Sequence, residues 1–118
     1  MAWRVAIASI DGILITEHFG RSRFFYVVDI QRDGSVVPVE RRDVDPSCGT
    51  GGHSDSGLES VVSTLKDCAA VLVAKIGPGA QQQLQRRGIH AIEGPAVAEE
   101  AYKKLADYYI KTKFPENS

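Results

Sequence analysis

The sequence predicts an α/β fold in which a mixed sheet lies between two layers of helices. In the first half, apolar and polar residues alternate between short turn signals, which is typical of antiparallel strands joined by hairpins. In the second half, segments with helical spacing alternate with short apolar runs, which is typical of parallel strands joined by helical crossovers. The length of 118 residues fits one domain, which we place at residues 1–110, followed by a polar C-terminal tail at 111–118.

The first half predicts four strands, at residues 1–8, 13–15, 24–30 and 36–42. The pair Asp11-Gly12 is a tight-turn signal and is expected to join the first two strands as a hairpin. The density of aromatic and β-branched residues in 24–30 predicts a strand buried on both faces. Because Pro38 has no N–H group to donate, its strand is expected at an edge of the sheet.

The second half predicts three helices, which begin near Ser56, Pro78 and Pro95, and two strands, at residues 69–74 and 89–92. Ser56 and Glu59 have the spacing of a capping box. Pro78 suits the first turn of the second helix, and Gly88 is placed to end it. In the third helix, the residues expected to face the core recur at helical spacing: Val97, Ala101, Leu105 and Tyr108.

The composition narrows the class of partner. The formal net charge of −1 gives no overall basic field for nucleic acid or for an acidic membrane surface, so we expect neither as a partner. Two cysteines make no disulfide framework, and the sequence contains no apolar segment of signal-peptide or membrane-spanning length. We therefore expect a cytoplasmic protein with reduced thiols.

A polar loop after the first strands carries the first candidate site. His18 lies in this loop, and its imidazole is a potential ligand for iron, copper or zinc, although a structural histidine at a strand end is equally consistent with the pattern. Arg21 and Arg23 offer charge-assisted donors to an anion, or simply face solvent. Phe19 is expected to pack in the core, and Gly20 to serve the backbone conformation.

A glycine-rich junction at residues 45–57 carries the second candidate site. It contains Cys48 and His53, a soft thiol and an imidazole suited to a metal or an anionic metal–sulfur cluster, and the alternative is a surface connection in which both are incidental. Their spacing is not diagnostic of zinc, and as a nucleophile pair they lack an identifiable orienting group. Cys68 is expected to be a core residue and His90 a structural histidine. A weaker anion cradle is conceivable at Lys75, Gly77 and Gly79, ahead of the second helix.

Several of these motifs together resemble a known family. The residues that carry the resemblance are Val5 to Ser9, Asp11-Gly12, and His18, Phe19, Gly20 and Arg21, followed by the helix from Ser56 and the segment Gly77, Pro78 and Gly79. Over about residues 4–105 the chain is similar to the dinitrogenase iron-molybdenum cofactor biosynthesis family, which includes nitrogenase accessory cluster carriers and small stand-alone proteins. The resemblance implies a ribonuclease H-like three-layer sandwich around a mixed five-stranded sheet.

The resemblance also implies a function. We expect non-catalytic binding, storage or delivery of an anionic molybdenum- or iron-containing metal–sulfur cluster, with His18, Cys48 and His53 as metal ligands. Phe19, Gly20, Arg21 and Arg23 are expected to complete the site. The implied partners are cluster donor and acceptor proteins, and the chain is expected to be a monomer or weak homodimer. The alternatives are a metal-dependent nuclease that uses Asp11, Glu17 and Asp29, and a metal-free docking module for a metalloenzyme.

Overall fold

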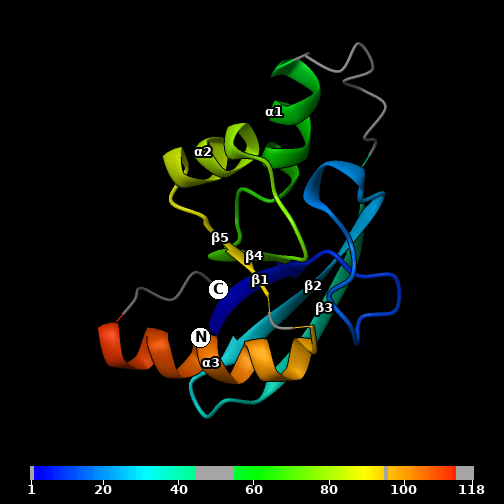
Figure 1. Cartoon of the computed structure of the whole chain (residues 1–118). Helices are drawn as coiled ribbons and strands as arrows, with labels where there is room; N and C mark the ends of the chain where they lie inside the picture. The colour runs from blue at the N-terminus through cyan, green and yellow to red at the C-terminus, as the bar shows by residue number, and fades with distance from the viewer. Residues whose placement is uncertain (1, 45–54, 95, 114–118) are drawn as a thin grey trace.

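The computed structural model describes residues 2–44, 55–94 and 96–113, with only the backbone described for 55–58. It contains five strands, three α-helices and one 3-10 turn in the order β1 (Ala2–Ile7), η1 (Phe19–Arg21), β2 (Phe24–Gln31), β3 (Val36–Asp43), α1 (Asp55–Thr64), β4 (Ala70–Val73), α2 (Pro78–Arg86), β5 (His90–Glu93) and α3 (Ala98–Thr112). Helices α1 and α2 cover one face of the sheet and α3 covers the other (Figure 1). The three-layer arrangement is therefore confirmed. No helix in the described ranges is long and apolar enough to cross a membrane.

The sheet joins an antiparallel half to a parallel half. Its strand order is β3-β2-β1-β4-β5, and β2 runs antiparallel to both of its neighbours while β1, β4 and β5 are parallel. Because β1, β4 and β5 point in the same direction, their carboxyl ends lie side by side at one end of the sheet. The loops that follow these strands are therefore brought together, and this end of the strands is where small molecules commonly bind in open α/β sheets.

Alternation along the strands separates two apolar cores, one on each face of the sheet. Val5, Ile7 and Leu72 face α3, where they pack with Tyr109. The opposite core, under α1 and α2, includes Phe25, Val71, Val62 and Leu84. Strand β4 is buried at all four positions, as its continuous apolar run predicts.

The prediction of a return strand at residues 13–15 is wrong. Leu14 makes only an isolated bridge to Val97, and Ile13 is 64% exposed. The reason is that the backbone of this segment bonds to residues at the start of α3: the Ile15 N–H donates to the Ala96 carbonyl at 2.7 Å, and the Ala98 N–H donates to the Ile13 carbonyl at 2.9 Å. Residues 10–14 are therefore a loop at the sheet edge and not a hairpin strand.

The predicted inner face of α3 is wrong at its last position. Tyr108 is 53% exposed, whereas Tyr109 is fully buried and packs against Trp3 with ring centroids 5.6 Å apart. The buried stripe of α3 includes Ala98, Ala101, Leu105 and Tyr109, so it drifts by one residue from the predicted stripe at its end. The helix also continues to Thr112, beyond the predicted start of the tail.

Other signals are confirmed. Pro38 lies in β3, which is an edge strand, and the register between β2 and β3 shifts at Val27/Val28. Pro78 is in the first turn of α2, and Gly88 follows α2 with φ +75°.

Helix α1 begins at Asp55, so Ser56 lies within the helix and not at the N-cap as predicted.

A network of ion pairs fastens the antiparallel half to the turn after α1. Arg4 on β1 donates to both carboxylate oxygens of Asp29, at 2.9 and 3.1 Å, and to Asp67 at 3.1 Å. Arg42 on β3 donates to the two oxygens of Asp67 at 2.6 and 2.8 Å, and to the Thr64 carbonyl. Hydrogen bonds from Arg42, followed by those from Arg4, hold the pKa of the Asp67 carboxyl well below its usual range.

Candidate binding site at the carboxyl ends of the parallel strands

The segment that contains His18 crosses the carboxyl ends of β1 and β4. The Glu17 N–H donates to the Ala8 carbonyl at 3.2 Å, and the Glu17 carbonyl accepts from the Ala74 N–H at 3.0 Å. The Phe19 N–H then donates to the Lys75 carbonyl at 2.9 Å, so His18 pairs with Lys75 in a parallel bridge. These bonds place an exposed imidazole beside an exposed lysine at the edge of the sheet.

Two buried side chains hold the turn after His18 in place. Phe19 is only 3% exposed and packs against Phe25 with ring centroids 5.7 Å apart, as its expected packing role requires. The buried Ser22 hydroxyl donates to the His18 carbonyl at 3.0 Å. Because Phe19 and Ser22 point inward, His18 and Arg21 are left on the outside of a rigidly held turn.

Arg21 and Arg23 converge on one small hollow. Its volume is about 190 Å³, and it is lined by Ser9, Ile10, Glu17, Arg21, Arg23 and Phe24. The lining residues include two arginines and one glutamate, so together they carry one net positive charge. The two arginines that the sequence singled out as anion partners therefore line the same hollow, whereas His18, which is close to them in the chain, is not among its lining residues.

One wall of the hollow is built by a side-chain-to-backbone turn that the sequence motif did not explain. The Ser9 hydroxyl accepts from the Gly12 N–H at 2.9 Å and donates to Asp11 Oδ1 at 3.1 Å. Asp11 Oδ1 also accepts from the N–H groups of Ile13 and Leu14, at 2.8 and 3.0 Å, and these bonds lower the pKa of its carboxyl. The hydrogen bonds of this turn, from Ser9 to Leu14, thus hold Ser9 at the hollow.

The second predicted segment is only partly testable. Cys48 and His53 lie outside the described residues. The chain enters that segment at Val44, whose N–H donates to the Arg23 carbonyl at 2.8 Å. Val44, the last residue described before the junction, therefore lies next to Arg23. Within the described ranges, no three His, Cys, Asp or Glu side chains are close enough together to hold a metal ion.

The conformational role expected for Gly20 is not supported. Its φ is not positive, unlike that of Gly12 at +79°, and a Cβ atom added to Gly20 would meet nothing within 4 Å. Ahead of α2, the Ile76 N–H already donates to Glu93 Oε2 at 2.9 Å, which leaves the proposed Lys75–Gly79 cradle with one fewer free donor. Lys75 is nevertheless beside His18, a neighbourhood that spacing in the sequence does not reveal.

The residues expected to be structural are structural. Cys68 is buried, and burial raises the pKa of its thiol to about 12, so it is an inert core residue. His90 Nδ1 lies 3.0 Å from the Tyr109 hydroxyl. Asp29 is bound by Arg4, and Asp11 is held in its turn, so neither is arranged with Glu17 as a two-metal nuclease site requires.

Sequence comparisons identify relatives that share most of this chain. A family model described as dinitrogenase iron-molybdenum cofactor matches residues 1–108. The FeMo cofactor biosynthesis protein NifB of Herbaspirillum seropedicae is 37% identical over 89 residues, which cover 75% of this chain and 17% of that protein. The protein of the same name from Frankia alni is 30% identical over 114 residues, which cover 94% of this chain and 22% of that protein. The chain thus spans about a fifth of the length of these relatives.

Solved structures share the same fold. The crystal structure of PH0822 matches with a TM-score of 0.65 and 28% identity, covering 89% of this chain and 91% of that one. The apo form of the orange protein from Desulfovibrio gigas matches with a TM-score of 0.56 and 21% identity, covering 98% of this chain and 93% of that one. Both similarities extend over nearly the whole chain, so the described α/β architecture is one that experiment has observed before.

Proposed function

This chain belongs to the dinitrogenase iron-molybdenum cofactor family, and from that membership we propose that it binds, stores or delivers an anionic molybdenum- or iron-containing metal–sulfur cluster without catalysing a reaction. The observation that carries the proposal is the hollow that Arg21 and Arg23 both line, in the segment that follows His18. A cargo of this kind is negatively charged, so guanidinium groups can donate charge-assisted hydrogen bonds to its sulfur or oxygen atoms. The hollow has room for roughly six water molecules, which suits a compact inorganic cargo.

The proposed division of labour follows the chemistry of each side chain. His18 supplies an imidazole nitrogen to the metal, while Arg21 and Arg23 balance the charge of the cargo. Cys48 and His53 are proposed as further ligands from a segment that starts beside Arg23. The described part of the site lies at the surface and contains an exposed histidine, and a surface site of this kind allows the cargo to leave again.

The proposal is tested with tetrathiomolybdate under anaerobic conditions. In equilibrium dialysis, the protein should retain the anion and carry its visible absorption through gel filtration. The Arg21→Ala/Arg23→Ala double variant should bind about tenfold more weakly, because it loses two charge-assisted hydrogen bonds. His18→Ala should change the absorption bands as well as the affinity, because a metal ligand is lost.

A matched control separates the site from general surface charge. Arg86 is exposed at the last turn of α2, at the amino end of β5 and thus away from the hollow, so Arg86→Ala should bind like the unsubstituted protein. The proposal would be contradicted if both the double variant and His18→Ala bound the anion as tightly as the unsubstituted protein. Separate Cys48→Ser and His53→Ala variants then decide whether the junction contributes ligands.

Two other functions remain distinguishable. A nuclease would cleave an RNA–DNA hybrid in the presence of magnesium or manganese, and Asp11→Asn would abolish that cleavage. A docking module for a metalloenzyme would capture its partner without any metal. Neither has a specific observation in its favour, since Asp11 is held in a turn and the hollow is cationic.

The wider expectations rest on the same proposal. The strand order, with β2 antiparallel to the other strands, supports the ribonuclease H-like arrangement that the family resemblance implies. We propose cluster donor and acceptor proteins as partners, and a cytoplasmic monomer or weak homodimer as the working form. Nucleic acid and membranes are not proposed as partners.

A further inference from the structure

The two outer strands of the sheet are protected to different degrees. Strand β3 contains Pro38, which cannot donate a hydrogen bond, and its register with β2 is interrupted so that Val39 has no opposite residue. These are features by which natural sheets prevent another strand from pairing with an edge. Strand β5, at the opposite edge, has neither a proline nor a bulge in its four residues, His90–Glu93.

Half of the backbone groups of β5 point away from the sheet. The His90 N–H donates to the Ala69 carbonyl at 2.9 Å and the Gly94 N–H donates to the Val73 carbonyl at 3.1 Å, so these residues face β4. Because backbone groups alternate along a strand, those of Ala91 and Glu93 face outward. Among the residues that the structure describes, no backbone group pairs with them.

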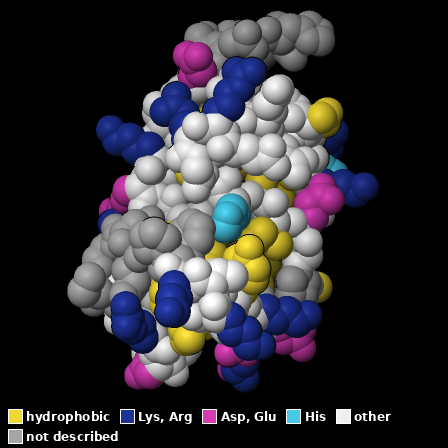
Figure 2. Space-filling model, turned by 90° about the vertical axis from the view of Figure 1, so that its left-hand side faces the viewer, with side chains coloured by type: hydrophobic (Ala, Val, Ile, Leu, Met, Phe, Trp, Pro, Cys, Tyr) yellow, Lys and Arg dark blue, Asp and Glu magenta, His cyan; other side chains and the backbone are white. Residues whose placement is uncertain are grey.

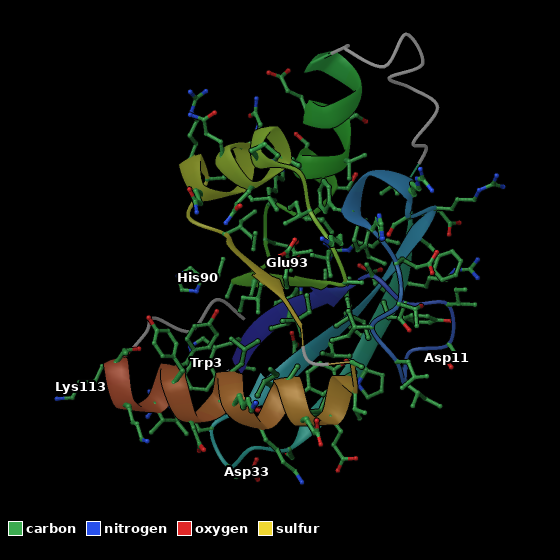
Figure 3. The ribbon with its side chains drawn as sticks, viewed as in Figure 1. Trp3, Asp11, Asp33, His90, Glu93 and Lys113 are labelled. Atoms are coloured by element: carbon green, nitrogen blue, oxygen red, sulfur yellow. The ribbon has the colours of Figure 1, made fainter. Side chains whose placement is uncertain are left out.

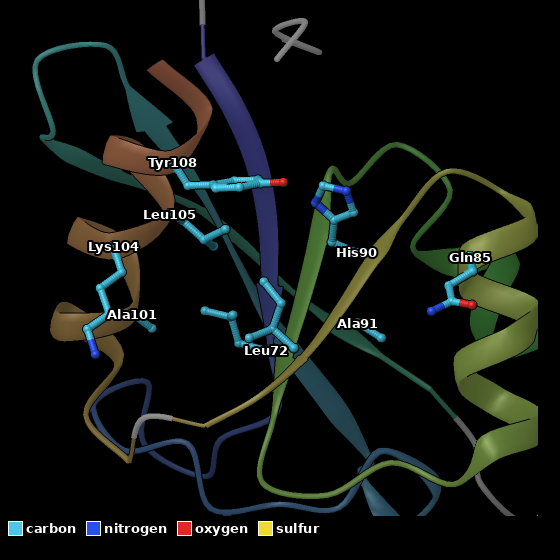
Figure 4. A pocket seen from close by; sticks show the side chains of 9 residues that line it. Leu72, Gln85, His90, Ala91, Ala101, Lys104, Leu105 and Tyr108 are labelled. Carbon is cyan, nitrogen blue, oxygen red and sulfur yellow. The ribbon is translucent and has the colours of Figure 1, made fainter. Parts of the chain in front are cut away.

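A hollow runs along this same edge. It has a volume of about 420 Å³, and its lining is mostly apolar, with contributions from α2, β4, β5 and α3: Leu72, Gln85, His90, Ala91, Ile92, Ala101, Lys104, Leu105 and Tyr108 (Figure 4). His90 and Ile92 lie on the α3 face of β5, whereas Ala91 packs toward the α2 side. The hollow therefore extends around the free edge of the strand and is not confined to one face.

The side chains of the edge leave it accessible. His90 and Tyr108 stand on opposite sides of the mouth, with ring centroids 6.3 Å apart in an edge-on arrangement (Figure 4). Figure 3 shows where His90 and Glu93 lie along β5. The carboxylate of Glu93 is engaged by the Ile76 N–H at 2.9 Å and so does not screen the edge. In a view of this side of the molecule, apolar side chains lie below and to the right of a histidine (Figure 2).

Basic side chains lie at one end of this edge. Arg86, in the last turn of α2, and Arg87, which follows it, are both exposed and precede β5, and Lys104 lines the hollow from α3. In the space-filling view, lysine and arginine side chains lie above and below the apolar area, and acidic side chains lie beside and below it (Figure 2). The two arginines at the end of α2 therefore offer charge complementarity to an acidic segment on that side of the strand.

We propose that the β5 edge binds an extended segment of a partner protein in which apolar residues alternate with acidic ones. The segment adds as a sixth strand, and its backbone exchanges hydrogen bonds with Ala91 and Glu93. Its apolar side chains fill the hollow on the α3 side, against Leu72, Leu105 and Tyr108. Because side chains alternate along a strand, its acidic side chains lie on the other face, where they meet the arginines at the end of α2. This inference does not depend on the proposed cargo or on its site.

The test uses the full chain and a fluorescein-labelled octapeptide of alternating valine and glutamate. Fluorescence anisotropy should show saturable binding, and hydrogen exchange followed by NMR should show that the peptide slows exchange at the amides of Ala91 and Glu93. Arg87→Glu should weaken binding about fivefold or more, because it reverses an exposed charge directly ahead of β5 on the α2 side. Lys103→Glu is the control for charge reversal elsewhere, since Lys103 lines a different hollow.

Two further measurements identify the mode of binding. A peptide with N-methylated backbone nitrogens on alternate residues should not bind, because it cannot pair with a strand. Ala91→Pro should abolish binding of the unmodified peptide, and a circular dichroism melt checks that this variant is folded. Binding that survives both changes would overturn the proposal.

Other occupants give opposite results. If the chain's own tail covers the edge, deletion of residues 114–118 will speed exchange at Ala91 and Glu93 in the absence of peptide. If a second copy covers it, exchange there will slow as the protein concentration rises. Either result, or peptide-induced protection at β3 instead of β5, would overturn the proposal.

Discussion

Asp67 binds arginine side chains from two strands at once. Its carboxylate accepts hydrogen bonds from Arg42 on β3 and from Arg4 on β1, although Asp67 itself lies in the turn after α1. Removing the carboxylate would leave two partly buried guanidinium groups with less countercharge. Sequence spacing gives no sign of this network, because its members are up to 63 residues apart.

We therefore expect Asp67→Asn to lower the free energy of unfolding at pH 7 by about 1–2 kcal/mol, a value reduced for partial exposure. Because the pKa of Asp67 is lowered in the folded state, its contribution is complete above the unfolded value of about 3.9 and is lost as the pH falls below it. The difference between the two proteins, measured by urea unfolding, should shrink from pH 7 to pH 3. A constant difference would show that the ionised carboxylate is not the cause.

Gly12 and Gly20, two glycines of the site motif, differ in how well a side chain would be tolerated at each position. Gly12 has φ +79°, and an added Cβ would lie 3.7 Å from the Tyr26 ring, whereas Gly20 has no positive φ and no neighbour within 4 Å. Gly12→Ala should lower the unfolding free energy by about 1 kcal/mol, because a side chain is strained in that conformation. Gly20→Ala should leave it within about 0.5 kcal/mol of the original value. Thermal unfolding of the two variants decides the point, and equal losses would contradict it.

At the scale of elements, the buried stripe of α3 decides how the sheet is covered. Tyr109 is fully buried between Trp3 and His90, and its neighbour Tyr108 is more than half exposed. Tyr109→Ala should lower the unfolding free energy by about 3–5 kcal/mol, because it leaves a cavity the size of a ring. Tyr108→Ala should cost less than about 1 kcal/mol. Denaturant unfolding of both variants tests the assignment, and the reverse order would restore the face predicted from the sequence.

Elements with strong local signals were predictable from the sequence. The apolar run of β4, the proline that opens α2 and the edge position of β3 each follow from side-chain chemistry that acts within a few residues. The segment at residues 13–15 was not predictable in this way. Its residues have strand-like character, but its backbone groups pair with residues at the start of α3, more than eighty positions later.

At the scale of the whole molecule, the topology brings the site together. The sequence indicated His18, Arg21 and Arg23 from their types, and the structure adds Ser9 and Lys75 because the carboxyl ends of β1 and β4 are neighbours. Ser9 could have been found from its place in the family motif, but the neighbourhood of Lys75 could not. The predicted contribution of Cys48 and His53 stays a prediction.

The proposed cargo site and the free sheet edge are neighbours through β5. Glu93 at the end of β5 accepts from Ile76, which directly follows Lys75, the residue paired with His18. A partner segment seated along β5 would therefore end close to the cargo. Binding of the octapeptide should be unchanged by Arg21→Ala/Arg23→Ala, because the two sites use different side chains; a loss of peptide binding in that variant would show that they are one site.

The central claim is that an anionic metal–sulfur cargo binds where the His18 segment crosses the carboxyl ends of β1 and β4. Chemical-shift mapping of the amides during an anaerobic titration with tetrathiomolybdate tests it most directly. The account predicts saturable shifts at Ser9, at residues 17–23 and at Lys75, with little change along β3. Saturable shifts confined to another surface, or no shift at His18, Arg21 and Arg23, would contradict it.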